Sequence, residues 1–214
     1  MTAIAPQLNA VFDGFSKNVP EAIKGPINSS RASLTDFDTS GIIKVGEKMP
    51  DFKLQNAVGE EVDSASLRAK GPLVLTFYRG EWCPFCNIAI SGFQKHISEF
   101  KAKGVTLVAV TPELPNGTLT MSEKHQLEFP VLTDAQNEFA RKLGVVWKMP
   151  ESLRPTFEKF GHNLPKRNGD DSFEVPLPAT LLIDQDGIVR NVYAEPDYIK
   201  RVEPQTVLEW IEKL

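Results

Sequence analysis

Short apolar runs alternate with amphipathic stretches along most of the 214-residue chain. The clearest apolar run spans 73–78 and is rich in residues that favour β-structure, so it predicts a buried strand. Residues 84–102 predict a helix, because their apolar side chains recur every three or four positions and share one face. These side chains are Cys86, Ile90, Phe93, Ile97 and Phe100. A second apolar run at 105–110 completes a strand–helix–strand unit, which implies parallel strands joined by a right-handed crossover.

The alternation continues on both sides of this unit. We expect a strand at 51–54, a helix at 118–126, an apolar run at 129–132, a helix from Asp134 as its N-cap through Leu143, and a helix at 151–160. Two β-rich runs at 178–184 and 188–193 flank the turn at Asp186-Gly187 and predict a hairpin. A helix from Pro204 closes the chain. This order predicts an α/β fold with a central mixed sheet flanked by helices.

Residues 1–44 look like a helical extension of a main domain at 45–214. Leu8, Val11, Phe12 and Phe15 have helical spacing, and a second short helix is expected near 30–37. The segment has too few apolar residues to form a core of its own. We therefore expect it to pack on the main domain or on a partner subunit.

Composition narrows the function classes. The chain is 41% apolar, enough for a sizeable core, and its net charge is −4 with no basic run, which argues against nucleic acid or an anionic membrane as partner. No apolar stretch approaches the length of a membrane span, about 18 residues. The first ten residues lack the pattern of a signal peptide. Together with the small number of cysteines, this predicts a cytosolic protein.

Cys83 and Cys86 are the only cysteines, and they lie where the 73–78 strand turns into the 84–102 helix. The first turn of a helix has unpaired N–H groups and partial positive charge, which stabilise a thiolate. Arg79 could add to this effect, and Glu81 would oppose it unless its side chain points away. Pro84 suits an early helical position, because its missing N–H would be unpaired there anyway. The apolar stripe predicts that Cys83 is the more exposed thiol and Cys86 the more buried one.

Several interpretations of the cysteine pair compete. A zinc site would need further ligands from His96, His125, His162 or carboxylates, and neither a second C-x-x-C nor a closely spaced histidine pair exists. A structural disulfide across so short a loop would constrain the unfolded chain little. Two inert core thiols are also conceivable. Reversible dithiol–disulfide chemistry is the favoured interpretation.

The motifs resemble the thioredoxin fold and, within it, the peroxiredoxin family of alkyl hydroperoxide reductases and thiol-specific antioxidants. The run from Phe77 to Cys86 is similar to that family's F-Y-P-x-x-x-T-x-x-C, with Cys86 at the peroxidatic position and Cys83 in place of the threonine. Residues 45–52 resemble its opening G-x-x-A-P-D-F segment, and 181–187 resemble its F-I-I-D-x-x-G hairpin. The resemblance covers about residues 45–214.

Two positions depart from the peroxiredoxin pattern. The family proline after F-Y is Arg79, which either supplies positive charge to the thiols or is a solvated loop residue. The family arginine before the late strand is Pro178, the residue that thioredoxins carry there in the cis form. We expect a cis bond at Pro178, and the alternative is a trans proline that opens a strand. Trp82 either flanks the site or covers core.

The resemblance implies a thiol peroxidase that needs no metal or organic cofactor and works as a homodimer. A hydroperoxide would oxidise Cys86 to a sulfenic acid, Cys83 would condense with it, and a thioredoxin- or glutathione-type reductant would reduce the disulfide. The alternative enzyme is a thioredoxin-like protein disulfide reductase, in which Cys83 would react first. A third class is a binding protein, either an iron–sulfur holder of the glutaredoxin type or a non-catalytic adaptor.

Overall fold

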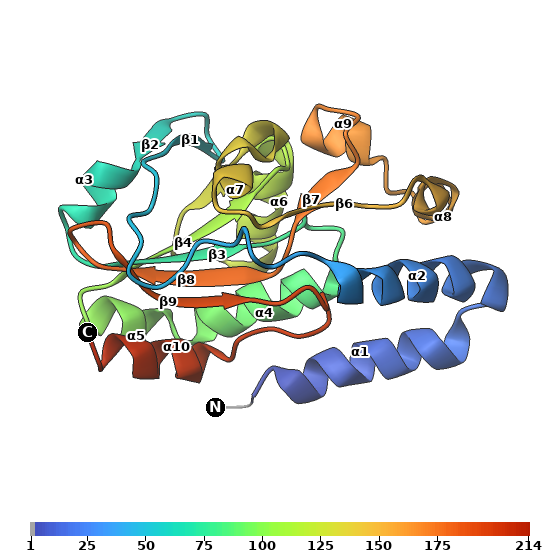
Figure 1. Ribbon diagram of the computed structural model, residues 1–214, viewed down its shortest axis with the longest axis horizontal. Coiled ribbons are helices and arrows are strands. Elements are labelled where there is room, and N and C mark those ends of the chain that lie inside the picture. Colours follow the sequence, from blue (N-terminus) through green and yellow to red (C-terminus); the bar gives the residue numbers. More distant parts are fainter. Residues whose placement is uncertain (1–2) are drawn as a thin grey trace.

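A mixed β-sheet forms the centre of the computed structural model, which describes residues 3–214 (Figure 1). Within these residues the sheet has seven strands in the order β2-β1-β5-β4-β3-β8-β9. The bounds are β1 Lys53–Asn56, β2 Glu61–Asp63, β3 Leu73–Phe77, β4 Thr106–Thr111, β5 Val131–Thr133, β8 Ala179–Ile183 and β9 Val189–Ala194. Strands β3, β4 and β5 are parallel, and β8 runs antiparallel to β3. The predicted α/β fold with a mixed sheet is therefore confirmed.

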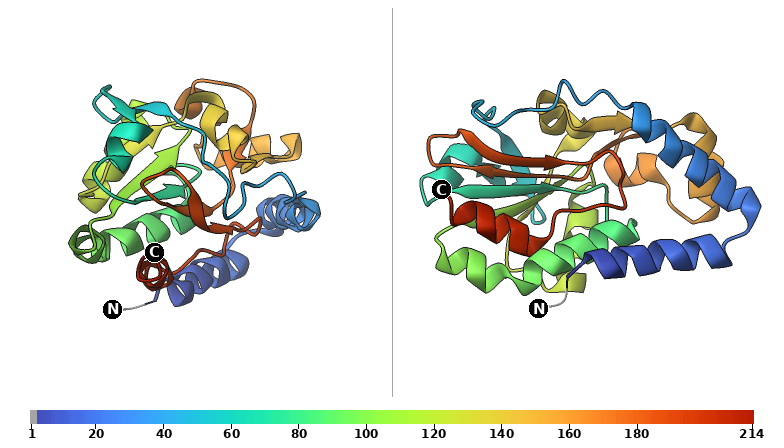
Figure 2. Two further views of the ribbon diagram at one scale, coloured as in Figure 1. Left: turned by 60° about the vertical axis from the view of Figure 1, so that its left-hand side comes forward. Right: turned by 60° about the horizontal axis from the view of Figure 1, so that its bottom comes forward.

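Helices cover both faces of this sheet. The helices of the described chain are α1 Ala5–Asn18, α2 Glu21–Ser33, α3 Ser64–Arg68, α4 Pro84–Lys95, α5 Ile97–Ala102, α6 Pro115–His125, α7 Glu138–Lys142, α8 Arg154–Lys159, α9 Leu164–Asn168 and α10 Pro204–Ile211, with short 3-10 turns at Leu34–Asp36 (η1), Ala135–Asn137 (η2) and Glu151–Leu153 (η3). One core lies between the sheet and α1, α4, α5, α6 and α10, and a second lies on the opposite face with α3 and α7 (Figure 2).

The strand–helix–strand unit and the late hairpin form as predicted. Strand β3 pairs in parallel with β4, and β8 pairs with β9. The helix predicted over 84–102 is divided at His96, whose backbone leaves helical geometry (φ −106°, ψ 5°). Its ring nitrogen Nδ1 lies 2.8 Å from the Glu99 carboxylate. The apolar stripe continues across the break, since Ile97 and Phe100 are both buried.

Asp134 acts on its helix from a greater distance than predicted. The turn η2 intervenes because Gln136 and Asn137 adopt left-handed backbone conformations, with φ of 58° and 56°. The Asp134 carboxylate still accepts hydrogen bonds from the backbone N–H groups of Phe139 (2.9 Å) and Ala140 (2.8 Å) in α7. The carboxylate therefore satisfies N–H groups at the start of the helix, as a cap does, across an inserted turn.

The N-terminal segment is more helical than the sequence suggests, although residues 1 and 2 lie outside the described part. The short helix expected near 30–37 corresponds to the end of α2 and the turn η1. Helix α2 begins at Glu21 and continues through Pro26, although a proline removes one helical hydrogen bond. A second sheet of β6 (Val146–Lys148) and β7 (Glu174–Pro176) also forms, and the sequence patterns predict neither of its strands.

The N-terminal helices pack on the rest of the chain. Ile4 and Leu8 are 3% and 2% exposed and belong to the same core as α4. Gly92 of α4 makes this approach possible, because a Cβ there would lie only 2.7 Å from Ile4. The Glu203 carboxylate accepts hydrogen bonds from the backbone N–H groups of Ile4 (2.9 Å) and Ala5 (2.8 Å) at the start of α1. The helix is thus fixed by both apolar and polar contacts.

Candidate redox site

The two cysteines lie at the start of α4, directly after the carboxyl end of β3. Cys83 is the residue before the helix, Pro84 is its first residue, and Cys86 lies in its first turn. Both cysteines are free thiols, and they approach each other to 2.9 Å. The two cysteines therefore lie together at a strand-to-helix turn, as expected, and Pro84 has the predicted early position in the helix, as its first residue.

The prediction that Cys83 is exposed is wrong, because both cysteines are 0% exposed. The prediction considered only the faces of the helix that carries the cysteines. In the fold, the Arg79 guanidinium and Tyr198, from the segment between β9 and α10, lie over the helix start. Burial of Cys83 is therefore a result of tertiary packing.

Arg79 contacts the thiol pair directly. One of its terminal nitrogens lies 3.2 Å from the Cys83 Sγ, and the side chain is buried, with 6% of its surface exposed. Its guanidinium carbon lies 4.1 Å from the ring centroid of Tyr198 and 5.2 Å from that of Trp82. Two aromatic faces therefore hold the cation in place. This geometry rejects the interpretation of Arg79 as a solvated loop residue.

Arg201 is the second cation at the site, and sequence reasoning missed it. A terminal nitrogen of Arg201 lies 3.5 Å from the Cys86 Sγ. The same guanidinium donates to the backbone carbonyls of Tyr198 and Lys200, which orients it toward the helix. The residue is 115 positions from Cys86 and belongs to no motif, so only the fold reveals it. The thiol pair thus lies between two guanidinium groups.

This environment moves the pKa values of the two thiols in opposite directions. Burial opposes ionisation of Cys86, but a hydrogen bond from Cys83 and the charges of Arg201 and Arg79 hold its pKa well below the usual value. Burial raises the pKa of Cys83 well above its usual value, and the neighbouring Cys86 thiolate adds to the rise. The arrangement favours a Cys86 thiolate that accepts a hydrogen bond from the Cys83 thiol.

The carboxylate of Glu81 points away from the sulfurs. It pairs with Lys124 at 2.7 Å and lies 3.8 Å from Arg167. The buried Glu113 accepts a hydrogen bond from the Glu81 backbone N–H at 2.7 Å and lies 3.3 Å from Arg167. These contacts keep negative charge away from the thiols.

Gly80 allows the turn between Arg79 and the cysteines. Its φ is 153°, and a Cβ there would lie 2.3 Å from the Trp82 indole nitrogen and 2.9 Å from the Glu113 carboxyl carbon. Asn87 supports the same turn, since its Nδ2 donates to the carbonyls of Glu81 and Cys83. The turn therefore depends on a residue without a side chain at position 80.

Pro178 does not have the expected cis bond, because no peptide bond within residues 3–214 is cis. It is a trans proline that immediately precedes β8, and its carbonyl accepts a hydrogen bond from Glu195 N–H at 3.1 Å. The trans form is the more stable one for X–Pro bonds, and a proline at a strand start needs no ladder hydrogen bond. It lines a minor hollow with Tyr78 and Arg201.

Trp82, Arg79 and Pro84 face a larger cavity of about 270 Å³ beside the thiols. The Trp82 ring packs edge-on against Phe157, with centroids 5.1 Å apart, and lies 5.7 Å from His162. Within the described residues, no group of three or more His, Cys, Asp or Glu side chains is arranged to hold a metal ion. The described helices also include none long and apolar enough to cross a membrane.

The chain is similar to known proteins over most of its length. The family model described as the AhpC/TSA family matches residues 45–192. Peroxiredoxin Bcp of Escherichia coli strain K12 is 24% identical over 171 residues, covering 80% of this chain and 97% of that protein. The chloroplastic peroxiredoxin Q of Triticum aestivum is 24% identical over 188 residues, covering 88% of this chain and 76% of that protein.

The chain is also similar to a thiol-disulfide oxidoreductase and to solved peroxiredoxin structures. The thiol-disulfide oxidoreductase ResA of Bacillus cereus is 22% identical over 176 residues, covering 78% of this chain and 84% of that protein. Peroxidoxin BcpB of Mycobacterium tuberculosis has a similar structure, with a TM-score of 0.63 at 22% identity, covering 80% of this chain and 98% of that one. With a C-x-x-C at the start of α4, a thioredoxin-like fold and a matching family model, the chain belongs to the AhpC/TSA family.

Proposed function

We propose that this chain is a thiol-dependent peroxidase in which Cys86 attacks the hydroperoxide and Cys83 resolves the product. The observation that carries the proposal is the buried thiol pair between Arg79 and Arg201. Two cations stabilise a thiolate and also attract the oxygens of a peroxide, on which negative charge develops as the O–O bond breaks. The names of the peroxiredoxin relatives support the same chemistry.

In the first step, the Cys86 thiolate attacks the terminal oxygen of the hydroperoxide. An S–O bond forms, the O–O bond breaks, and the departing alkoxide or hydroxide takes up a proton, which leaves Cys86 as a sulfenic acid. Arg79 and Arg201 neutralise the charge that moves from sulfur to the departing oxygen. The reaction needs no metal ion or organic cofactor.

In the second step, Cys83 attacks the Cys86 sulfur, and water departs. The pKa of Cys83 is raised by burial and by the Cys86 thiolate beside it. Oxidation of Cys86 removes that negative charge, so Cys83 then loses its proton more easily. The short approach of 2.9 Å allows an S–S bond to form with little movement. An external thioredoxin- or glutathione-type thiol then reduces the disulfide.

A single-turnover comparison tests this assignment. Wild type, Cys83→Ser and Cys86→Ser are mixed with hydrogen peroxide, and sulfenic acid is trapped and located by mass spectrometry. We expect Cys83→Ser to accumulate sulfenic acid at Cys86 and Cys86→Ser to form none at the wild-type rate. Rapid sulfenic acid formation at position 83 in Cys86→Ser would reverse the two roles.

Protein disulfide reduction is the second candidate function. The similarity to ResA and the position of Cys83 before the helix favour it. The complete burial of Cys83 opposes it, because a protein disulfide must reach the attacking sulfur. Insulin reduction by wild type, with no consumption of peroxide, would select this alternative, whereas inactivity in both assays would favour a binding protein.

We also propose that the protein acts in the cytosol as a homodimer. A reducing compartment suits a chain whose two cysteines both belong to one redox pair. The dimer rests on the resemblance to peroxiredoxins. Light scattering at micromolar concentration tests it, and a mass of one chain would exclude the dimer under those conditions.

A further inference from the structure

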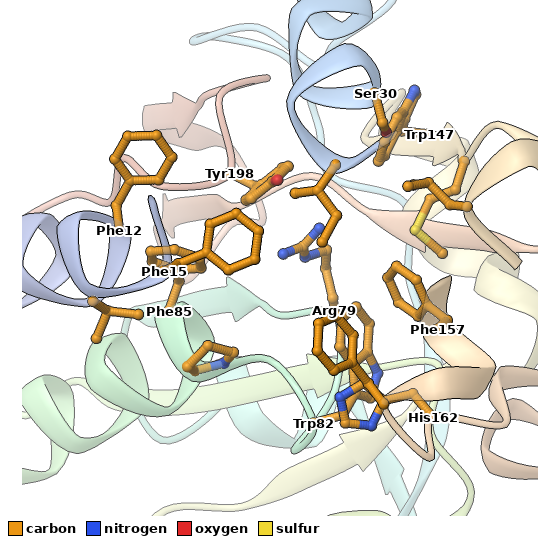
Figure 3. Close-up of a pocket in the computed structure, with 16 residues that line it drawn as sticks. Phe12, Phe15, Ser30, Arg79, Trp82, Phe85, Trp147, Phe157, His162 and Tyr198 are labelled. Carbon is orange, nitrogen blue, oxygen red and sulfur yellow. The ribbon is translucent and has the colours of Figure 1, made fainter. Parts of the chain in front are cut away.

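The cavity of about 270 Å³ beside the thiols is enclosed from two directions (Figure 3). Helices α1 and α2 form one wall, and the segment from β6 through α8 to His162 forms the other. The first wall includes Phe12, Phe15, Ile27 and Ser30, and the second includes Phe157 and His162. The N-terminal helices therefore complete a chamber whose other residues come from the main domain at 45–214.

The chamber walls are almost wholly apolar or aromatic. Its volume of about 270 Å³ exceeds that of a dry apolar cavity of about 150 Å³ that takes up benzene, and water needs two to four polar partners that such walls rarely offer. Ligand sites of proteins have this character, with an apolar lining and a few placed polar groups. The chamber is thus suited to an apolar body of the size of one aromatic ring with a short branch.

Three buried polar atoms of lining residues have no hydrogen-bond partner among residues 3–214. They are the Nε of Arg79, the hydroxyl of Ser30 and the indole Nε1 of Trp82, and the residues Arg79 and Ser30 are 6% and 4% exposed. Figure 3 shows the guanidinium of Arg79 among the rings of Phe15, Tyr198 and Phe157. Buried donors seldom lack a partner in folded proteins. An occupant with oxygen atoms at the Arg79 end would supply one.

Arg79 connects the chamber with the reactive sulfurs. One terminal nitrogen contacts Cys83, whereas the same side chain lines the chamber. The sulfurs do not line it, so a peroxide group must reach them along the guanidinium, with a small displacement of Arg79 or Tyr198. The chamber is therefore the route by which a bound molecule would present its polar end to the thiols.

We propose that Phe12, Phe15 and Ile27 of the N-terminal helices, which lie outside the region matched by the family model, determine which hydroperoxides the site accepts, by closing a chamber that favours an aromatic or branched apolar body. The inference rests on the proposed peroxidase function. The apolar body lies between α1–α2 and α8, and the hydroperoxide group points to Arg79. The reaction balances as ROOH plus two thiols giving ROH, water and one disulfide, with an external dithiol restoring the thiols.

The first experiment compares kcat/KM for cumene hydroperoxide and for hydrogen peroxide. We expect wild type to prefer cumene hydroperoxide. Ile27→Trp fills the chamber and should lower that ratio about tenfold or more, since loss of fit in an apolar pocket changes specificity by roughly 10–200-fold per group. Phe15→Ala removes a wall and should lower the ratio too. The matched control is Phe37→Ala, because Phe37 is also half-buried in the N-terminal segment but packs in the opposite core.

The second experiment separates binding from turnover. In the double variant Cys83→Ser/Cys86→Ser, we expect 2-phenyl-2-propanol, the product of cumene hydroperoxide, to change tryptophan fluorescence, because Trp82 and Trp147 line the chamber. Ile27→Trp should weaken this binding at least tenfold. Product binding without turnover of any peroxide would contradict the proposed peroxidase function but not the binding role of the chamber. Turnover of both peroxides, with the ratio of the two kcat/KM values unchanged in Ile27→Trp and Phe15→Ala, would refute the proposed role of the chamber in specificity.

Discussion

Removal of the Arg201 charge provides a direct test of the electrostatic argument for Cys86. The variant Arg201→Met keeps the length of the side chain and removes its cation, which lies 3.5 Å from the Cys86 Sγ. At that separation Coulomb's law gives about 5 kcal/mol with an effective dielectric constant of about 20, and about 1 kcal/mol in bulk water. One pKa unit corresponds to about 1.4 kcal/mol, so loss of the cation raises the pKa of Cys86 by roughly one to three and a half units.

We expect the pKa of Cys86 to rise by about two units, because Arg201 is half-buried and its charge is only partly screened. The sign follows from the cation, which favours the thiolate. With the cation gone, the thiolate exists only at higher pH, and less of it is present at neutral pH. The assay is the pH dependence of alkylation, measured separately for the two cysteines by peptide mass spectrometry.

Two control variants isolate the effect of this charge. Arg201→Lys retains a cation and should keep most of the shift, although a lysine cannot reproduce the geometry of the guanidinium. Arg141→Met removes a surface arginine that pairs with Glu174, so it should leave the profile of Cys86 unchanged. If Arg201→Met leaves the Cys86 midpoint where it is in wild type, or moves only that of Cys83, the assignment of the low-pKa thiol is wrong.

Three further predictions concern the structure around the site. Arg31→Met breaks a bidentate ion pair with the β9–α10 segment that carries Arg201, so we expect slower alkylation of Cys86 and a loss of up to about 1 kcal/mol of unfolding free energy in urea titrations. Gly80→Ala forces a clash with Trp82, so it should lower the free energy of unfolding by about 1–3 kcal/mol and reduce peroxide turnover. Its control is Gly14→Ala, which should be neutral or stabilising because no atom lies within 4 Å of the new Cβ. Leu8→Ala creates a hole in the core shared with α4 and should cost about 2–5 kcal/mol in the same titrations, and an unchanged midpoint would show that α1 is not part of the folded unit.

Much of the fold follows from local patterns in the sequence. The runs at 73–78 and 105–110 become β3 and β4, and the Asp186-Gly187 turn joins β8 to β9. Each of these elements is specified by the spacing of apolar residues or by a short turn motif, and both can be recognised in the sequence. The same holds for the place of the two cysteines at a strand-to-helix turn, and for Arg79 close to them in the chain.

Tertiary structure alone decided the environment of those cysteines. Arg201, the burial of Cys83 and the apolar chamber all arise from segments that are distant in sequence and come together only in the folded chain. The trans bond at Pro178 likewise depends on the surroundings of the proline. These surroundings could not be inferred from the sequence motif or from the resemblance to thioredoxins. A sequence pattern specifies which face of a helix is apolar, but it cannot specify which distant charge or ring covers that face. The reactivity of the thiols depends on such contacts, because charge and desolvation act through space and not along the chain.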